Sequence, residues 1–125
     1  MSIEKAKEFL HLLEARDLER AKTFLAPEFE MTFPGGINMN SLEELIEWSK
    51  ERYTQVSKTF EEFDEIQDGD SVIVYSMGRL NGIALDGSAI RDVRYIDRFV
   101  FEDSLIVKQE VWNDLAEFLR PIHIG

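Results

Sequence analysis

Residues 71–101 read SVIVYSMGRLNGIALDGSAIRDVRYIDRFVF, and this stretch decides the fold. Apolar and polar residues alternate on both sides of Asp86-Gly87, a dipeptide that favours a two-residue β-hairpin. A tight turn there pairs Ile83 with Ile90. The same register continues along both strands, so it predicts which side chains share each face of the sheet.

The register pairs Gly78 with Tyr95 and Ser76 with Asp97, and it divides the hairpin into an apolar inner face and a mixed outer face. The predicted inner face carries Val72, Val74, Ser76, Gly78, Leu80, Val93, Tyr95, Asp97, Phe99 and Phe101. The predicted outer face carries Ile73, Tyr75, Met77, Arg79, Arg94, Ile96, Arg98 and Val100. A slip of one residue would exchange the two faces.

Two features interrupt the inner face. Ser76 and Gly78 are small, which predicts empty volume in mid-sheet, and Asp97 is a carboxylate among aromatic residues. Burying such a group costs several kcal/mol unless it is hydrogen-bonded or protonated. Space beside a buried acid is typical of a small-molecule site. The alternative is that Asp97 turns outward through a β-bulge and pairs with Arg94 or Arg98.

The remaining elements follow from periodicity and breakers. Helices are expected over residues 3–14, after a cap at Asp17 and up to Pro27, from Ser41 with Glu44 as a capping box, and over 114–119 before Pro121. A strand with alternating Phe29, Met31 and Phe33 ends at Pro34-Gly35-Gly36, and four strands fill residues 57–112. This segregation predicts an α+β fold with a curved antiparallel sheet wrapped by N-terminal helices, as one domain over residues 1–125.

Composition excludes several functions. The 125 residues carry 25 acidic and 14 basic side chains, a net charge of −11, with no cysteine. Nucleic-acid binding needs a basic patch, so neither nucleic acid nor an anionic membrane is an expected partner. No signal core or membrane span is evident, which favours the cytoplasm. His11 and His123 stand apart, and no metal site or cofactor is predicted.

The chain resembles a known superfamily over nearly its whole length. The stretch Tyr95–Ile106, followed by Glu110-Val111-Trp112-Asn113-Asp114, is similar to nuclear transport factor 2-like proteins, and within them to SnoaL-like proteins and ketosteroid isomerases. Ser104 stands where the superfamily usually has glycine. The resemblance implies a cone-shaped α+β fold with a pocket between sheet and helices, and frequent homodimers.

The resemblance also allows the catalytic residues of related enzymes to be compared with the matching positions of this sequence. The sheet aspartate of ketosteroid isomerases corresponds to Asp97, but their helix tyrosine corresponds to Phe9 and their base to a position near Thr32. Steroid isomerase activity is therefore not expected. The polar set of limonene epoxide hydrolases is missing, because Val111 stands at the matching strand end. SnoaL-like cyclases use an aspartate as acid and base, a role that Asp97 could fill.

Three functions remain open: a binder of a small apolar molecule, an isomerase, cyclase or lyase that uses Asp97 for proton transfer, and a dimeric assembly domain with a vestigial pocket. The predicted pocket residues, which surround Asp97, are Phe9, Leu13, Phe33, Trp48, Tyr53, Ser76, Gly78, Tyr95, Val111 and Asn113. Gln109 joins Asn113 as a further polar candidate if the last strand turns both inward. The apolar outer-face residues, including Ile73, Tyr75, Met77 and Ile96, predict a homodimer.

Overall fold

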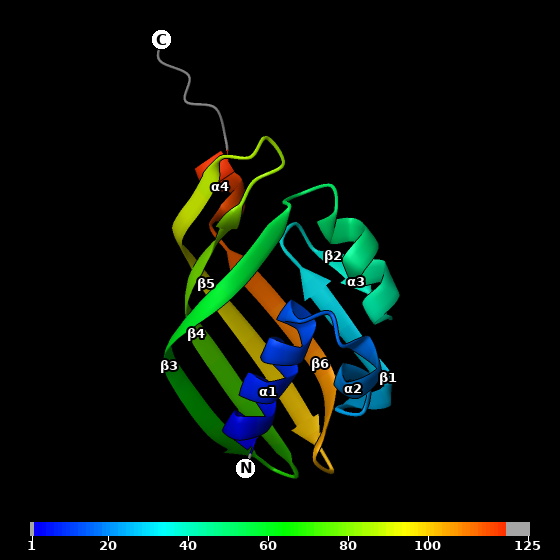
Figure 1. Cartoon of the computed structure of the whole chain (residues 1–125). Helices are drawn as coiled ribbons and strands as arrows, with labels where there is room; N and C mark the ends of the chain where they lie inside the picture. The colour runs from blue at the N-terminus through cyan, green and yellow to red at the C-terminus, as the bar shows by residue number, and fades with distance from the viewer. Residues whose placement is uncertain (1, 120–125) are drawn as a thin grey trace.

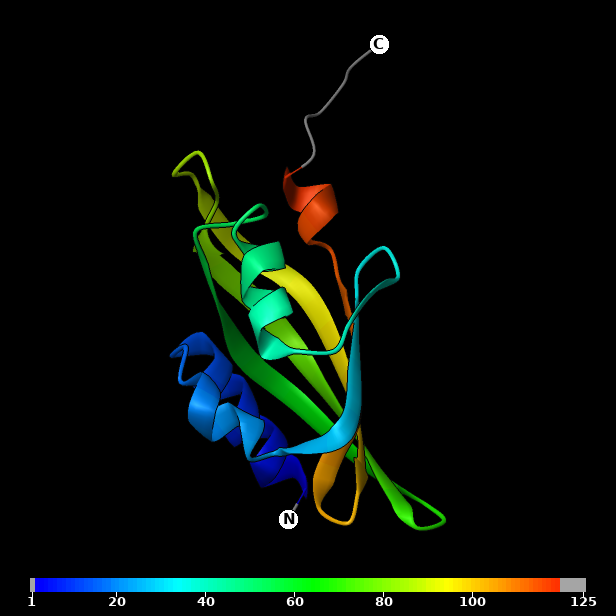
Figure 2. The ribbon, with the colours of Figure 1, turned by 90° about the vertical axis from the view of Figure 1, so that its right-hand side faces the viewer.

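The computed structural model describes residues 2–119, and it is an α+β fold with a curved, open sheet. The helices are α1 (Ser2–Glu14), α2 (Leu18–Lys22), α3 (Leu42–Ser49) and α4 (Leu115–Leu119). The strands are β1 (Leu25–Phe33), β2 (Ile37–Met39), β3 (Gln55–Asp68), β4 (Ser71–Ile83), β5 (Ala89–Glu102) and β6 (Leu105–Asn113). Figure 1 shows α1 lying across the sheet, and in Figure 2 α1, α2 and α3 all lie on the same side of it.

The sheet order is β2-β1-β6-β5-β4-β3. The strands β3 to β6 form the predicted antiparallel meander, but β1 pairs with β6 in parallel. The purely antiparallel sheet expected from the sequence is therefore wrong at one pair. The short strand β2, which the sequence did not predict, pairs with the end of β1 after the turn at Gly35 and Gly36, both at positive φ.

The β4–β5 hairpin confirms the predicted faces but not the predicted turn. Ser76 pairs with Asp97 and Gly78 with Tyr95, as expected. Ile83, however, pairs with Ala89 and not with Ile90, because the register shifts between Leu80 and Gly82. Asp92 adopts a positive φ of 54° on the opposite strand, where an extra residue is accommodated as a β-bulge. Asp86-Gly87 consequently sits within a wider loop.

The predicted capping residues Ser41 and Asp17 begin α3 and α2. The Ser41 hydroxyl accepts a hydrogen bond from the backbone N–H of Glu44 and caps α3, and Asp17 caps α2 in the same way through Arg20 N–H. α2 ends earlier than expected. Pro27 lies inside β1, in a segment where the pairing with β6 is interrupted between Leu25 and Glu30, so its missing N–H costs no ladder hydrogen bond. The stop at Pro121 and His123 lie outside the described residues.

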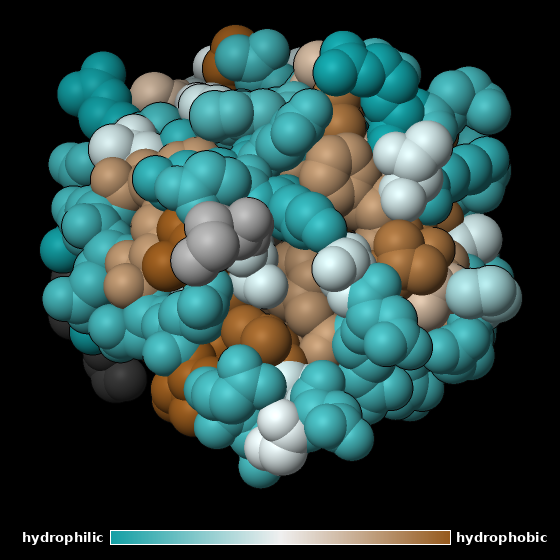
Figure 3. Space-filling view, turned by 90° about the horizontal axis from the view of Figure 1, so that it is seen from below, coloured by the Kyte–Doolittle hydropathy of each residue, from teal (hydrophilic) through white to brown (hydrophobic). Residues whose placement is uncertain are grey.

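The core fills the space between α1, α3 and the inner face of the sheet. Phe9 is fully buried and meets Phe99 edge-on, with ring centroids 6.0 Å apart. A smaller apolar cluster near the β4–β5 loop includes Leu80, Val93 and Leu115. At the end of the molecule seen in Figure 3, hydrophilic residues cover most of the surface and apolar surface shows between them.

Candidate ligand-binding site

Asp97 lies at the centre of the inner face. Its strand neighbours are Ser76 on β4 and Val111 on β6, and its side chain is completely buried. The predicted alternative, an outward Asp97 paired with Arg94 or Arg98, is wrong. Arg94 pairs with Asp114 and Arg98 with Glu110, both on the other face.

The partner of Asp97 is Lys58, which the sequence analysis missed. Lys58 Nζ lies 2.5 Å from Asp97 Oδ2, and only 15% of the lysine side chain is exposed. The ammonium group also lies 4.8 Å from the centroid of the Tyr95 ring, a cation–π distance. The available signal was the alternation of Val56, Lys58 and Phe60 on β3, which places the lysine on an apolar strand face.

Further contacts hold this pair in place. The backbone N–H of Lys58 donates to Glu14 Oε1 at 2.7 Å, which ties β3 to the end of α1. The Tyr95 and Ser76 hydroxyls share a buried hydrogen bond of 2.9 Å. Burial raises the pKa of Tyr95 far above its ordinary value, so its hydroxyl keeps its proton. Tyr95 therefore offers Lys58 a neutral aromatic face.

The electrostatics of Asp97 follow from its burial. Desolvation raises the pKa of Asp97, and the charge and hydrogen bond of Lys58 oppose this only in part. Among the described residues, Asp97 Oδ1 has no hydrogen-bond partner. Ionised carboxylates are stabilised by several donors, so a single donor on one oxygen leaves the charged form of Asp97 poorly compensated.

A cavity of about 70 Å³ lies between α1, α3 and the sheet, and Lys58 forms part of its wall. Apolar and aromatic side chains make up about half of its lining, and charged and polar side chains the rest. The lining consists of Leu10, Leu13, Glu14, Arg16, Phe33, Leu45, Ser49, Tyr53, Val56, Lys58 and Gln109. Asp97 is not part of this lining, and it reaches the cavity wall through its contact with Lys58. Gln109, on the same face of β6 as Val111, is only 2% exposed.

The structure brings together only part of the predicted pocket. Leu13, Phe33 and Tyr53 line the cavity. Trp48 packs on Phe33, with ring centroids 5.0 Å apart, and supports the wall from outside. Phe9 belongs to the core.

Four strand residues differ from the expectation that they surround open space. A Cβ on Gly78 would lie 2.0 Å from the Thr59 carbonyl oxygen, because β3 bulges toward it, so Gly78 permits close backbone approach and does not line the inner cavity. The Ser76 side chain is buried against Tyr95. Val111 is buried opposite Asp97. Asn113 accepts a hydrogen bond from Leu115 N–H and starts α4.

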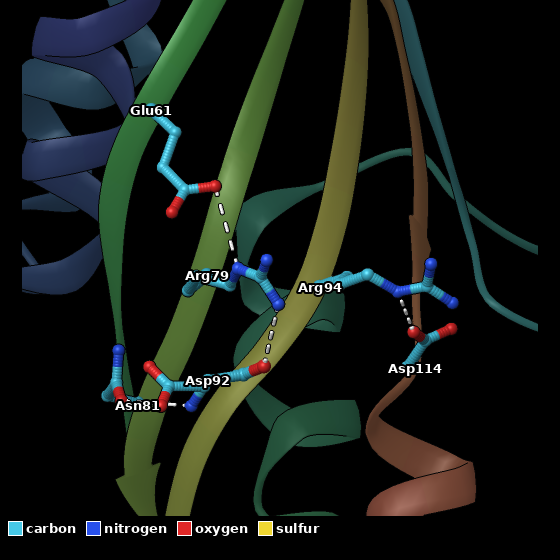
Figure 4. A network of polar contacts seen from close by, with 6 residues as sticks. All are labelled: Glu61, Arg79, Asn81, Asp92, Arg94 and Asp114. Atoms are coloured by element: carbon cyan, nitrogen blue, oxygen red, sulfur yellow. Dashed lines mark hydrogen bonds and ion pairs between the residues drawn. The ribbon is translucent and has the colours of Figure 1, made fainter.

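A second, larger hollow of about 660 Å³ lies on the outer sheet face, and Met77, Ile96 and Trp112 are part of its lining. Gly78, Tyr95 and Asn113, which the sequence predicted for the inner pocket, border this hollow. Arg79 and Arg94 are directly paired across β4 and β5, and each is turned toward an acid (Figure 4). Arg79 lies 3.5 Å from Glu61, and Arg94 lies 2.5 Å from Asp114. The outer face thus combines exposed apolar surface with compensated charges.

Within residues 2–119, no cluster of three or more acidic or histidine side chains has the arrangement of a metal site. None of the helices in this same part of the chain has the length and apolar character that a membrane crossing requires. The polar side chains that line the inner cavity are those of Glu14, Arg16, Ser49, Tyr53, Lys58 and Gln109.

Comparison with known proteins agrees with this architecture. A sequence profile of the SnoaL-like domain matches residues 6–109. The chain belongs to the SnoaL-like domain family. No curated protein matches this SnoaL-like domain at a significant level.

Solved structures show the same fold at low sequence identity. A nuclear transport factor 2-like protein of unknown function from Burkholderia pseudomallei is 21% identical, with 98% of each chain covered and a TM-score of 0.74. TerC, co-crystallised with polyporic acid, is 19% identical over 94% of each chain, with a TM-score of 0.75. A protein from Jannaschia sp., provisionally named a SnoaL-like polyketide cyclase, is 17% identical over 97% of this SnoaL-like domain and 93% of that chain, with a TM-score of 0.67.

Proposed function

We propose that this SnoaL-like domain binds a small, mostly apolar molecule between α1, α3 and the sheet, with Lys58 and Asp97 as the polar anchor. The observation that carries the proposal is the buried Lys58–Asp97 pair beside a partly apolar cavity. Such a pair is costly to desolvate and contributes little net stability. A role in recognition accounts for its presence where an apolar pair would serve the fold.

The size of the cavity limits what enters it. An engineered cavity of about 150 Å³ holds one benzene molecule, and the space here is about 70 Å³. The inner end therefore accepts a small group, such as a carbonyl and its neighbouring carbons, while the rest of the ligand lies toward Glu14 and Arg16. A carbonyl oxygen would accept a hydrogen bond from Lys58 Nζ.

The binding proposal is tested by NMR titration with cyclopentanone as the probe. Amide shifts are expected to concentrate at Leu13, Tyr53, Lys58 and Gln109. Lys58→Gln keeps a donor for Asp97 but removes the ammonium group, so binding should weaken about fivefold to tenfold, the difference between charged and neutral hydrogen bonds. Lys108→Gln, on the outward side of β6, is the matched control and should bind like the wild type. Shifts confined to the outer face would reject the proposal.

A second candidate is proton transfer by Asp97, favoured by the raised pKa of this carboxyl group. One of the similar structures carries the provisional name of polyketide cyclase, and cyclisations of that kind need an acid and a base. An enzyme of this type should exchange the α-hydrogens of cyclopentanone for deuterium in D₂O. Proton transfer by Asp97 would be excluded if the wild type exchanged these hydrogens no faster than buffer alone. It would also be excluded if Asp97→Asn exchanged them as fast as the wild type.

We also propose a homodimer through the outer sheet face. Ile66, Ile96 and Trp112 are 48%, 40% and 51% exposed there, although Ile73 is already buried within one copy. Arg79, Arg94 and Arg98 on this face are each paired with an acid of the same copy. A two-fold axis near Met77 would therefore bury the apolar surface of both copies without leaving an unpaired arginine.

Sedimentation velocity tests the dimer. The wild type should sediment as a dimer at high micromolar concentration, and Ile96→Arg should shift it to a monomer. Leu85→Arg, on the β4–β5 loop and 57% exposed, is the matched control and should leave the dimer intact. A wild-type monomer at that concentration contradicts the proposal.

A further inference from the structure

Two acceptor oxygens near the cavity lack a protein donor. Of the buried side-chain polar atoms in the described part of the chain, only Asp97 Oδ1 and Gln109 Oε1 have no hydrogen-bond partner. Asp97 pairs with Val111 and Gln109 with Phe99, so the two residues are diagonal neighbours on the inner face. An unsatisfied buried acceptor costs about 1–3 kcal/mol. Gln109, unlike Asp97, lines the cavity, so its oxygen indicates a site that another molecule completes.

Several of the neighbouring polar groups are already engaged. Ser76 and Tyr95 bond to each other, and the Ser49 hydroxyl donates to the Ile46 carbonyl oxygen. Lys58 uses one of the three hydrogens of its ammonium group on Asp97. Since Lys58 and Gln109 both line the cavity, its inner end presents an ammonium donor beside a glutamine amide whose oxygen has no donor.

The charges of the cavity are balanced before any ligand enters. Lys58 is paired with Asp97, and the wall also contains one further acid, Glu14, and one further base, Arg16. An anionic ligand would add a negative charge without a free counter-ion at a poorly solvated position, which is unfavourable. A neutral ligand meets no such cost.

We propose that the cavity selects a neutral ligand whose inner end carries a hydrogen-bond donor next to an acceptor, with Gln109 Oε1 receiving the donor and Lys58 Nζ bonding the acceptor. Lactams, hydroxyketones and enolised diketones have this arrangement. The inference rests on the proposed function, because it concerns the same cavity. It goes further in assigning Gln109 as the residue that determines specificity.

The test compares three probes with equal numbers of non-hydrogen atoms: 2-pyrrolidinone, with a donor beside its carbonyl; cyclopentanone, with the carbonyl alone; and butyrate, an anion. NMR titration of the wild type should give 2-pyrrolidinone the lowest Kd, about fivefold below cyclopentanone, as expected for one hydrogen bond. In Gln109→Met, which keeps the side-chain length and removes the amide, the two rings should bind equally. A purely structural role of Gln109 would not change this ratio.

The outcomes separate the two proposals. If cyclopentanone and 2-pyrrolidinone bind the wild type equally, or if butyrate binds best, the donor-and-acceptor inference is wrong while ligand binding stands. Tighter binding of cyclopentanone shows that Gln109 turns its amide nitrogen inward and also overturns the inference. If neither ring binds, the proposed function fails together with it. Should Gln109→Met not fold, Gln109→Leu provides the same comparison, and the wild-type ratio decides by itself.

Discussion

The inner and outer faces of the sheet each hold an ion pair of the same length in opposite surroundings. Lys58–Asp97 on the inner face and Arg94–Asp114 on the outer face both have a nitrogen–oxygen distance of 2.5 Å. The exposed side-chain fractions are 15% and 0% for the inner pair, against 73% and 41% for the outer pair. The two pairs therefore match in distance and in their aspartate partner, and they differ strongly in burial.

The contrast separates two quantities: the net stabilisation that an ion pair provides, and the loss of stability when one partner of the pair is removed. Exposed pairs are screened by water and contribute about 0–1 kcal/mol. A buried pair adds little over two apolar residues, but removal of one partner leaves an isolated charge away from water. The inner pair should consequently be sensitive to single substitutions, and the outer pair should tolerate them.

The largest expected effect is that of Lys58→Met. It leaves Asp97 buried with no donor, so unfolding free energy at pH 7 should fall by about 3 kcal/mol. The loss should shrink as pH falls toward the unfolded-state pKa of about 3.9, because protonation of the buried Asp97 removes the uncompensated charge. Urea unfolding at both pH values measures it.

The matched control is Arg94→Met, which breaks the outer pair and should cost less than about 1 kcal/mol at pH 7. Equal losses for the two variants would show that burial does not distinguish the pairs. A Lys58→Met loss that grows toward low pH would contradict the assignment of Asp97 as the stranded charge.

Asp97→Asn should change how stability depends on pH. Because burial raises the pKa of Asp97, the wild type loses stability as pH rises from the unfolded value of about 3.9 through the folded pKa, and then levels off. The variant lacks this loss and keeps an acceptor for Lys58. The difference in unfolding free energy, variant minus wild type, should therefore increase with pH between 4 and 8, by about 1.4 kcal/mol for each unit of pKa shift. A decrease over this range would mean that Lys58 outweighs desolvation and lowers the pKa of Asp97.

The smallest expected effect belongs to Gln109→Met in the absence of ligand. The substitution removes an unpartnered buried acceptor and keeps nearly the same volume, so stability should stay equal or rise by up to about 1 kcal/mol. Thermal unfolding at neutral pH measures it, with Lys108→Met as the control at a neighbouring half-buried position. A loss of more than about 2 kcal/mol would show that Gln109 has a structural hydrogen bond.

The alternation in β4 and β5 was enough to predict the two faces, since one of them is far more apolar than the other. It favoured a buried Asp97 but left open a bulge that would turn this side chain outward. The alternation could not predict that Lys58 is the partner of Asp97. Lys58 lies on β3 and reaches past β4 to Asp97 on β5, and such a contact depends on how the strands are arranged in the folded protein. Gly78 was misread for the same reason. Its role depends on the bulged backbone of β3, which local sequence does not reveal.

The parallel pairing of β1 with β6 has a consequence for how the chain acquires its structure. Thr32 and Glu110 are strand partners although about 80 residues separate them, so β1 has no neighbour on that edge until the last strand has been synthesised. The β3–β6 meander contains only local connections and is expected to form first, since closing long loops slows folding. Gln109 lies on β6 and Leu13 on α1, so the cavity walls come together at that final docking step. Pulse-labelling hydrogen exchange should show protection in β4 and β5 before β1, and simultaneous protection would indicate that the ends of the chain meet as early as its middle.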